Sequence, residues 1–158
     1  MSIIPTMNLR IVKANYTHSQ HASALRVLLN EYAKDPMGGG AALPDVVLNS
    51  LAAQLANIPH AFTVLAFVDE QPAGLINGFE GFSTFKAKPL LNLHDITVLP
   101  QFRGQGISRK MFELVEQIAR ERGCCKITLE VLEGNHLAKQ AYTNFGFNGY
   151  ALDPTLGT

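Results

Sequence analysis

The stretch LLNLHDITV (residues 90–98) and the stretch LPQFRGQGISRK that follows it (residues 99–110) decide how this chain is expected to fold. The first is a mainly apolar run typical of a strand, and the apolar periodicity of a helix begins near Ile107. Glycines and cations gather at the junction: Arg103, Gly104, Gly106, Arg109 and Lys110. A helix that opens directly after a strand presents unpaired backbone N–H groups and the positive end of its dipole. The junction therefore predicts an anion site, although a tight turn also explains two glycines.

Two familiar phosphate-binding loops do not fit this junction. The dinucleotide pattern G-x-G-x-x-G needs a glycine at the position of Arg109, and the P-loop needs G-K-[ST] at the end of a longer loop. The sequence therefore satisfies neither of these two phosphate-binding patterns.

Composition limits the classes of function. The 158 residues are 47% hydrophobic, which predicts one domain spanning residues 1–158. Thirteen basic residues balance thirteen acidic ones, so we expect no nucleic-acid partner and no membrane partner. The first residues lack the pattern of a secretory signal, and no stretch approaches 18 apolar residues. We therefore expect a soluble, cytoplasmic protein.

The two cysteines, Cys124 and Cys125, are adjacent. Neighbours in an extended strand point to opposite faces, so we expect reduced core thiols rather than a disulfide. No C-x-x-C or H-x-x-x-H pair is present, so we expect no metal.

The first half of the chain predicts a strand, two helices and a hairpin. Residues 8–14 alternate as a strand does, and Thr17 with Gln20 predicts a capping box for a helix that the segment DPMGGG (residues 35–40) ends. Pro44 suits the first turn of a second helix, which continues to Ile58. Residues 61–68 and 75–79 then read as an antiparallel hairpin.

The second half predicts alternating strands and helices. After the strand at 90–98 and the helix from Ile107, residues 126–132 read as a strand, 135–145 as a short helix and 146–152 as a last strand. No repeat or low-complexity linker divides the chain. An α/β fold built on one sheet is therefore expected.

Two motifs carry a resemblance to a known family. The segment QFRGQG (residues 101–106) matches the acetyl-CoA signature [QR]-x-x-G-x-[GA], and NHLAKQAYTNFGF (residues 135–147) matches the pattern N-x-x-A-x-x-x-Y-x-x-x-G-F. Both belong to the GNAT superfamily of N-acetyltransferases, and they occur here in the family's order and separation. The chain resembles that family over nearly its whole length, most closely from residue 90 to 150.

The resemblance implies a fold and a cosubstrate. The GNAT-like fold is a mixed, mostly antiparallel sheet flanked by helices, with splayed fourth and fifth strands that correspond here to 90–98 and 126–132. Acetyl-CoA is the implied cosubstrate, with its diphosphate on backbone amides of Arg103, Gly104, Gln105, Gly106, Ile107 and Ser108. Its pantetheine arm is expected to pair with backbone near Ile96 and Val98. Asn135 resembles the family's asparagine near the pantetheine, and it also suits a helix N-cap or turn. Homodimers are common in the family.

The resemblance also implies direct attack of an acceptor amine on the thioester within a ternary complex, without a protein nucleophile. A backbone N–H near Val98 is the expected oxyanion donor. Tyr142 is the candidate acid that protonates the leaving thiolate, and its alternative is a core position. Asp95 is the preferred base; the strand alternation is expected to point His94 to the opposite face. His94, Glu130 and a water chain stay alternatives for the base.

The acceptor is less closely specified. The segment FSTF (residues 82–85) ahead of Asp95 resembles the diamine and thialysine acetyltransferase branch, in which an acidic pair follows. Here His94 replaces one acid, so we expect a small amine or an amino-acid-like molecule rather than a polyamine. Residues 35–40 form either a wall of the acceptor site or a connector. The alternatives are an acyl-CoA-binding regulatory module and an acetyltransferase for a protein amine.

Overall fold

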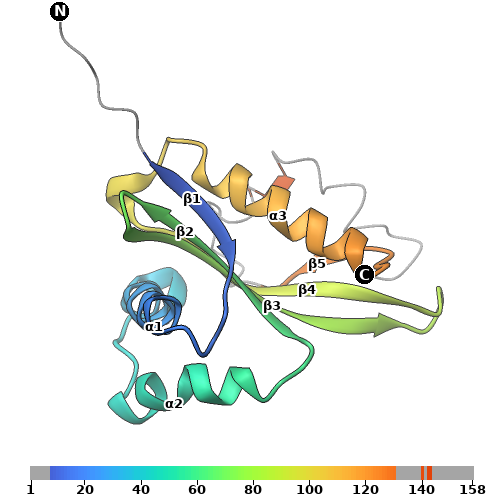
Figure 1. Cartoon of the computed structure of the whole chain (residues 1–158), viewed down its shortest axis with the longest axis horizontal. Helices are drawn as coiled ribbons and strands as arrows, with labels where there is room; N and C mark the ends of the chain where they lie inside the picture. The colour runs from blue at the N-terminus through green and yellow to red at the C-terminus, as the bar shows by residue number, and fades with distance from the viewer. Residues whose placement is uncertain (1–7, 131–139, 141, 144–158) are drawn as a thin grey trace, which may run out of the picture.

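The computed structural model describes residues 8–130, 140, 142 and 143. These residues form a five-stranded sheet in the order β1-β2-β3-β4-β5, with helices on both sides (Figure 1). The strands are β1 (Leu9–Lys13), β2 (Ala61–Val68), β3 (Gln71–Ser83), β4 (Lys88–Val98) and β5 (Ile127–Leu129). The helices are α1 (Ser19–Lys34), α2 (Asp45–Ala56) and α3 (Ile107–Glu121), with short 3₁₀ helices η1 (Pro36–Gly38) and η2 (Pro100–Phe102).

The sheet is mixed and mostly antiparallel, as predicted. Strands β1 to β4 pair antiparallel, whereas β5 pairs parallel to β4 over Leu91–Leu93 because α3 carries the chain back across the sheet. The β2–β3 hairpin is closed by Asp69 and Glu70, both at positive φ, which suits the twist of the strands that flank it. The last described backbone hydrogen bond between β4 and the chain after β5 runs from the Glu130 N–H to the Leu93 carbonyl, 2.7 Å. Residues 131 and 132 of the predicted fifth strand lie outside the described residues, so the splay stays a prediction.

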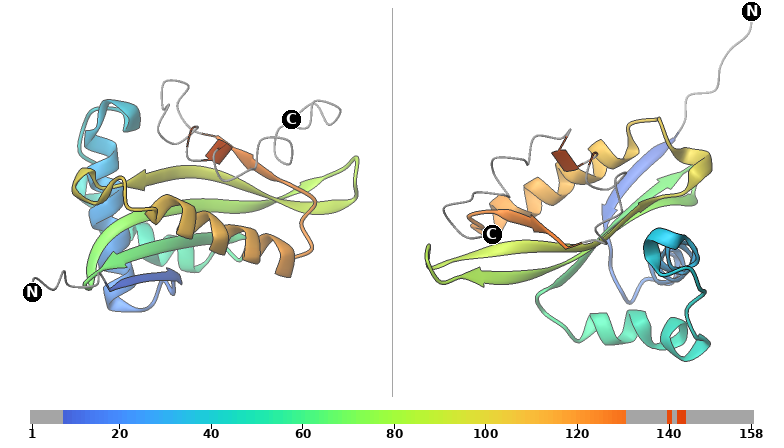
Figure 2. Two further views of the ribbon diagram at one scale, coloured as in Figure 1. Left: turned by 90° about the horizontal axis from the view of Figure 1, so that it is seen from above. Right: turned by 180° about the vertical axis from the view of Figure 1, so that it is seen from behind.

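Two apolar clusters cover the two faces of the sheet. Helix α3 packs on one face, and helices α1 and α2 pack on the other (Figure 1 and Figure 2). All eight residues of β2 are buried, because this strand has helices above and below it. The cluster under α3 contains Met111, Phe112, Val115 and Ile118, and the cluster under α1 contains Leu25 and Leu28.

The helix that begins near residue 17 starts differently from the prediction. Helix α1 has His18 as its N-cap and no side-chain cap hydrogen bond among the described residues, so the predicted capping box is wrong. The Thr17 hydroxyl donates instead to Asn15 Oδ1 at 2.8 Å. The Gln20 amide donates to Glu70 Oε2 at 2.9 Å. Both side chains of the expected box have other partners. Pro44 precedes α2 as its N-cap.

A β-bulge in β4 changes which side chains share a face. Asn77 of β3 is opposite Asp95, and Gly78 is opposite Leu93, so His94 is the extra residue. Leu93 and Ile96 both lie in the cluster under α3. His94 and Asp95 lie between these two residues in the strand. His94 contacts Phe79 and Asp95 contacts Asn77, both on the α1 and α2 side. The prediction that His94 and Asp95 point to opposite faces is therefore wrong, because the bulge interrupts the strand alternation.

The end of the chain is described only at three helical residues, Gln140, Tyr142 and Thr143. The rest of the predicted helix at 135–145 and the predicted strand at 146–152 lie outside the described residues. None of the helices in the described part of the chain is both long and apolar enough to span a membrane.

Candidate functional site

The glycine loop joins β4 to α3. After η2, residues 103–106 are exposed, and Ile107 is buried where α3 begins. Gly104 and Gly106 both have φ of +77°, and a Cβ at either position meets no atom within 4 Å. The left-handed backbone therefore requires glycine here. The open space around both positions lets a ligand approach the backbone closely.

The first turn of α3 is electrostatically suited to an anion. The Lys110 N–H donates to the Gly106 carbonyl at 3.2 Å, so the amides of Ile107 and Ser108 lie ahead of this hydrogen bond. The first turn contains no acidic residue and includes Arg109 and Lys110. Cations oppose the helix dipole at this end, and an anion bound to the amides reverses that penalty. Their ion pairs with Glu113 are exposed and weak.

Arg103 closes the loop onto the end of β4. Its Nε donates to the Val98 carbonyl at 2.9 Å, and its backbone N–H donates to the Pro100 carbonyl at 3.3 Å. These contacts engage the Arg103 amide within the loop, whereas Gly104, Gln105 and the residues after them form its exposed part and the helix start. Ile96 and Val98 lie opposite Ile76 and Gly74 of β3. The roles of their backbone toward pantetheine stay predictions.

Asp95 is half-buried and hydrogen-bonded. The Asn77 Nδ2 donates to Asp95 Oδ2 at 3.2 Å. Burial raises the pKa of Asp95 above its ordinary value, while the Asn77 hydrogen bond and the nearby His94 act in the opposite direction. A carboxylate whose pKa is raised holds a proton more readily than an ordinary one, which suits a general base.

The other two candidates for the base lie beside Asp95. His94 Nε2 is 3.5 Å from Glu130 Oε2, and the His94 ring packs edge-on against Phe79 at 4.9 Å between centroids. Both side chains are exposed to a large extent, 41% for His94 and 69% for Glu130. The fold therefore brings Glu130 after β5 to His94 of β4, which is next to Asp95 in the chain, and Glu130 is the most exposed of the three.

Tyr142 lies in the core. Its side chain is 1% exposed, and its ring packs edge-on against Phe112 with 5.9 Å between centroids. The Tyr142 hydroxyl donates to the Ile127 carbonyl of β5 at 2.6 Å. To protonate a thiolate, this hydroxyl has to exchange that carbonyl for the sulfur. Its role as the acid stays a prediction, and Asn135 lies outside the described residues.

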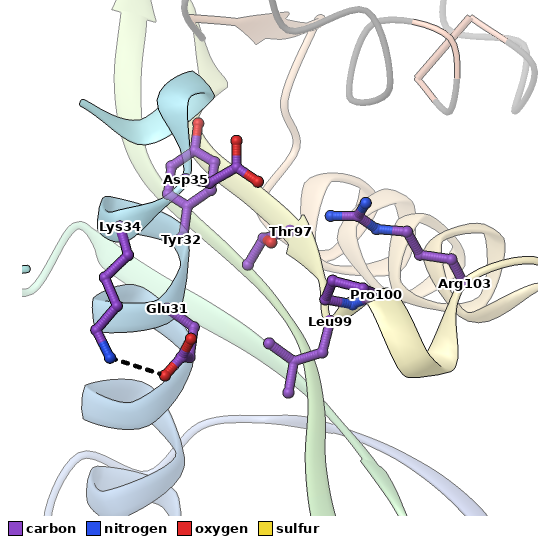
Figure 3. Close-up of a pocket in the computed structure, with 8 residues that line it drawn as sticks. All are labelled: Glu31, Tyr32, Lys34, Asp35, Thr97, Leu99, Pro100 and Arg103. Carbon is purple, nitrogen blue, oxygen red and sulfur yellow. Dashed lines mark hydrogen bonds and ion pairs between the residues drawn. The ribbon is translucent and has the colours of Figure 1, made fainter. Parts of the chain in front are cut away.

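A cavity lies between the end of α1 and the glycine loop (Figure 3). It has a volume of about 260 Å³ and is lined by Glu31, Tyr32, Lys34, Asp35, Thr97, Leu99, Pro100 and Arg103. Thr97 is two residues after Asp95 on β4, so the two side chains share a face of the sheet. The lining contains two acidic and two basic side chains, and Lys34 pairs with Glu31 at 3.1 Å.

Sequence reasoning missed most of this cavity. Of its lining, only Arg103 was a predicted site residue, and Asp35 belongs to the DPMGGG segment. The remaining members come from the last turns of α1, from Thr97 of β4, and from Leu99 and Pro100 after that strand. No local motif marks such residues, because the cavity exists only after α1 packs beside β4.

The DPMGGG segment packs against the end of α1. A Cβ at Gly38 would collide with the Tyr32 carbonyl, so this position requires glycine. The Gly40 N–H donates to the Asp35 carbonyl and the Ala41 N–H to the Ala33 carbonyl, each at 3.0 Å. The segment therefore fixes the last turn of α1, which lines the cavity.

The FSTF segment lies at the β3–β4 hairpin. Phe82 and Phe85 are 62% and 82% exposed, and neither lines the cavity.

The cysteines Cys124 and Cys125 are free and half-buried. Burial raises the pKa of Cys124 to about 11, so its thiol is protonated near neutral pH. Among the residues that the structure describes, no group of three or more His, Cys, Asp or Glu side chains is placed to hold a metal ion.

Comparison with known proteins agrees with this architecture. The model of the acetyltransferase (GNAT) family matches residues 23–147, which is more than half of the chain. The chain therefore belongs to the GNAT acetyltransferase family.

Individual relatives match shorter segments. A thialysine N-epsilon-acetyltransferase from Caenorhabditis elegans is 31% identical over 83 residues, 52% of this chain and 50% of the relative. A streptothricin acetyltransferase from Streptomyces lavendulae is 37% identical over 90 residues, 57% of this chain and 48% of that protein. The chain thus spans about half the length of these curated relatives. An aminoglycoside N-acetyltransferase solved with CoA shares the fold, with a TM-score of 0.74 at 18% identity over 92% of this chain and 91% of that one.

Proposed function

We propose that this protein transfers the acetyl group of acetyl-CoA to a primary amine of a small molecule. The observation that carries the proposal is the cavity between the glycine loop and the end of α1, on the face of β4 that also bears Asp95. A cosubstrate on the loop and an acceptor in the cavity would meet at β4. Family membership and the names of the two curated relatives support an acetyl transfer.

The loop residues fit the diphosphate of acetyl-CoA. The backbone of Gly104 and Gly106 is open to a ligand, and Ile107 and Ser108 lie in the first turn of α3, where backbone N–H groups have no partner within the helix. The neighbouring Arg109 and Lys110 supply positive charge. The thioester is expected to lie along β4 near Ile96 and Val98.

The reaction needs an acceptor amine without its proton. The amine nitrogen attacks the thioester carbonyl carbon, the carbon–sulfur bond breaks, and the CoA thiolate leaves and takes a proton. In this proposal Asp95 receives the proton of the amine, directly or through one water molecule. His94 and Glu130 stay the alternatives that variants have to separate.

The charges of the cavity favour an acceptor that carries both signs. Glu31 and Asp35 suit a cationic amine, and Lys34 and Arg103 suit a carboxylate. An amino-acid-like amine carries both kinds of charge, whereas a polyamine has no carboxylate to offer Lys34 or Arg103. The cytoplasmic location and the homodimer stay predictions.

The test is an acetyl-CoA consumption assay with thiol release as the readout. The acceptors are amino acids with a side-chain amine, simple monoamines, polyamines and lysine-containing peptides. We expect turnover with the amino acids and little with polyamines. Tight binding of acetyl-CoA without turnover of any amine would favour a regulatory CoA-binding module, and turnover restricted to peptides would favour a protein acceptor.

Binding of the cosubstrate is measured separately, by the shift in thermal unfolding. Acetyl-CoA at about one hundred times its dissociation constant stabilises a folded protein by ~2.7 kcal/mol. A folded protein whose unfolding is unaffected by acetyl-CoA and by CoA would rule out the glycine loop as their site.

A further inference from the structure

A continuous chain of hydrogen bonds crosses the sheet and ends on Asp95. Tyr16 follows β1, and its hydroxyl lies 2.9 Å from the Thr63 hydroxyl on β2. Thr63 donates to Asn77 Oδ1 on β3 at 2.6 Å, and Asn77 Nδ2 donates to Asp95 Oδ2 on β4 at 3.2 Å. Thr63 is 0% exposed and Asn77 is 6% exposed, so both lie inside the apolar packing under α1 and α2.

The chain has one direction. A threonine hydroxyl has a single proton, and the Thr63 proton goes to Asn77, so Tyr16 is the donor to Thr63. Two contacts fix the orientation of the Asn77 amide. Its Oδ1 accepts the Thr63 proton, and the opposite orientation would place this oxygen against the Asp95 carboxylate. Every donor in the chain therefore points toward Asp95.

Stability alone does not require this chain. Replacing two hydrogen-bonded partners by apolar groups of the same shape is nearly neutral, and valine has the shape of threonine. A second Thr–Asn pair gives a direct contrast: Asn92 Nδ2 donates to Thr128 Oγ1 at 2.6 Å, and Thr128 lies 3.4 Å from the Leu91 carbonyl. That pair ends on a backbone carbonyl, whereas the chain through Asn77 ends on a half-buried carboxylate.

We propose that Asn77 is a positioning residue for Asp95, and that Thr63 and Tyr16 hold the Asn77 amide in the orientation that this role needs. The inference rests on the proposed function, in which Asp95 takes the proton of the acceptor amine. Asn77 occupies Oδ2, so Oδ1 is the oxygen that receives the proton. The same hydrogen bond stabilises the ionised carboxylate against the effect of burial.

Other groups that titrate or carry charge lie along the hydrogen-bond chain, beside β4 and around the cavity. They are His94 on β4 and Glu130 after β5, Tyr16 at the far end of the chain with Arg122 acting on it, and Glu31, Tyr32, Lys34, Asp35 and Arg103 around the cavity beside Thr97. Asn77→Val alters none of these groups directly. Thr63→Val alters only Tyr16, by removing its hydrogen-bond partner, and Tyr16 stays neutral across the acidic limb because burial raises its pKa. A change in the titration of Asp95 is therefore assignable to the chain.

The experiment compares Asn77→Val, Thr63→Val and Thr63→Ser with the wild type in the pH profile of kcat/KM. Activity needs ionised Asp95, so we expect Asn77→Val to move the midpoint of the acidic limb up by about one pH unit, because a hydrogen bond to a charged group is lost. Thr63→Val is expected to give a smaller shift in the same direction. Thr63→Ser keeps the hydroxyl and is expected to restore the wild-type profile. The KM for acetyl-CoA stays unchanged in all three.

The matched control is Thr128→Val. It removes a threonine–asparagine hydrogen bond of the same length that has no connection to Asp95, so the midpoint of its acidic limb is expected to stay at the wild-type value. An equal shift in Thr128→Val and Thr63→Val would show a general effect of perturbing the sheet and would overturn the proposal.

A readout independent of turnover separates this proposal from the proposed function. The carboxyl carbon of Asp95 is titrated by NMR in the folded protein, with Asp95→Asn to assign the signal. A higher midpoint in Asn77→Val or Thr63→Val supports the positioning role even if no tested amine is acetylated. Wild-type midpoints in folded Thr63→Val and Asn77→Val overturn it, and if Asn77→Val does not fold, the Thr63→Val and Thr63→Ser pair decides. Full activity in Asp95→Asn overturns the base assignment instead.

Discussion

Under α3, the buried side chains Met111, Val115 and Ile118 pack against apolar side chains of the strands, whereas the packing under α1 and α2 contains the buried polar side chains of Thr63 and Asn77. Both faces exclude water, and buried polar groups cost free energy unless they are paired. The polar atoms lie on the face that also bears Asp95 and the cavity. Under the proposed function, the α3 face mainly supplies stability, while the α1 face also bears the proposed base, Asp95.

The largest expected effect is that of Asp95→Asn on the α1 side of the sheet. Asp95→Asn keeps the size of the side chain and removes the base, so kcat is expected to fall by about 10²- to 10⁴-fold. The affinity for acetyl-CoA is expected to stay near the wild-type value, because the loop is untouched. Steady-state kinetics and calorimetry measure the two quantities. Full activity in this variant would transfer the role to water, His94 or Glu130.

The free energy of unfolding of the wild type, compared with that of Asp95→Asn, is expected to depend on pH. Burial raises the pKa of Asp95 in the folded state above its ordinary value, 3.8, so folding disfavours the ionised form. The contribution of Asp95 to stability is therefore complete below the ordinary pKa and is lost as the pH rises through the raised value. Relative to Asp95→Asn, the wild type is expected to lose stability across that interval. Urea unfolding at several pH values measures the difference, and a wild type that gains on the variant as the pH rises would contradict it.

Two core substitutions of the same kind, each from a buried aliphatic residue to alanine, compare the two faces of the sheet. Ile118→Ala under α3 and Leu28→Ala under α1 each remove a buried aliphatic side chain, at a cost of about 2–5 kcal/mol in the free energy of unfolding. Leu28 lies one turn before Tyr32, which lines the cavity. We therefore expect Leu28→Ala alone to raise the KM for the acceptor. An equal rise in both variants would show that the faces are not functionally distinct.

Tyr142 is the exception on the α3 side, because its hydroxyl is a polar atom within that packing. Tyr142→Phe leaves the buried Ile127 carbonyl without this donor, so a loss of about 1–3 kcal/mol in unfolding free energy is expected. A role as the acid adds a fall in kcat of about 10²-fold, the low end for general acids because a thiolate leaves readily. Thermal unfolding and kinetics separate the two. A wild-type kcat in Tyr142→Phe would show that the Tyr142 hydroxyl only stabilises the packing against β5.

The smallest effect concerns the glycine loop. Because Gly106 has φ of +77°, a bulky residue such as valine strains the backbone there and is expected to perturb the fold. Gly106→Ala is the milder test, and Gly123→Ala is its control, since Gly123 has φ of +69° and the same open space but lies after α3. Both are expected to cost about 1 kcal/mol in stability.

The two glycine variants differ in the binding of acetyl-CoA. Only Gly106→Ala is expected to weaken it, because its methyl group keeps phosphate away from the backbone. Isothermal titration calorimetry measures the dissociation constants. Equal affinity in the two variants would make Gly106 a turn residue and place the phosphate elsewhere.

Local sequence determined the elements and the glycine loop. Apolar periodicity places α3 from Ile107, the run at 61–68 forms β2, and the glycines at 104 and 106 adopt the left-handed backbone that few other residues tolerate. These features depend on contacts between residues close in the chain. Sequence therefore carries enough information to predict them.

Only the tertiary structure decided which side chains meet. The bulge at His94 depends on how β3 pairs with β4, and alternation along one strand cannot reveal it. The hydrogen-bond chain joins residues from Tyr16 to Asp95, and the cavity joins Glu31 to Arg103. Burial and hydrogen-bond partners, which set the pKa of Asp95, come from residues distant in sequence, so its environment exists only once the sheet and α1 have packed.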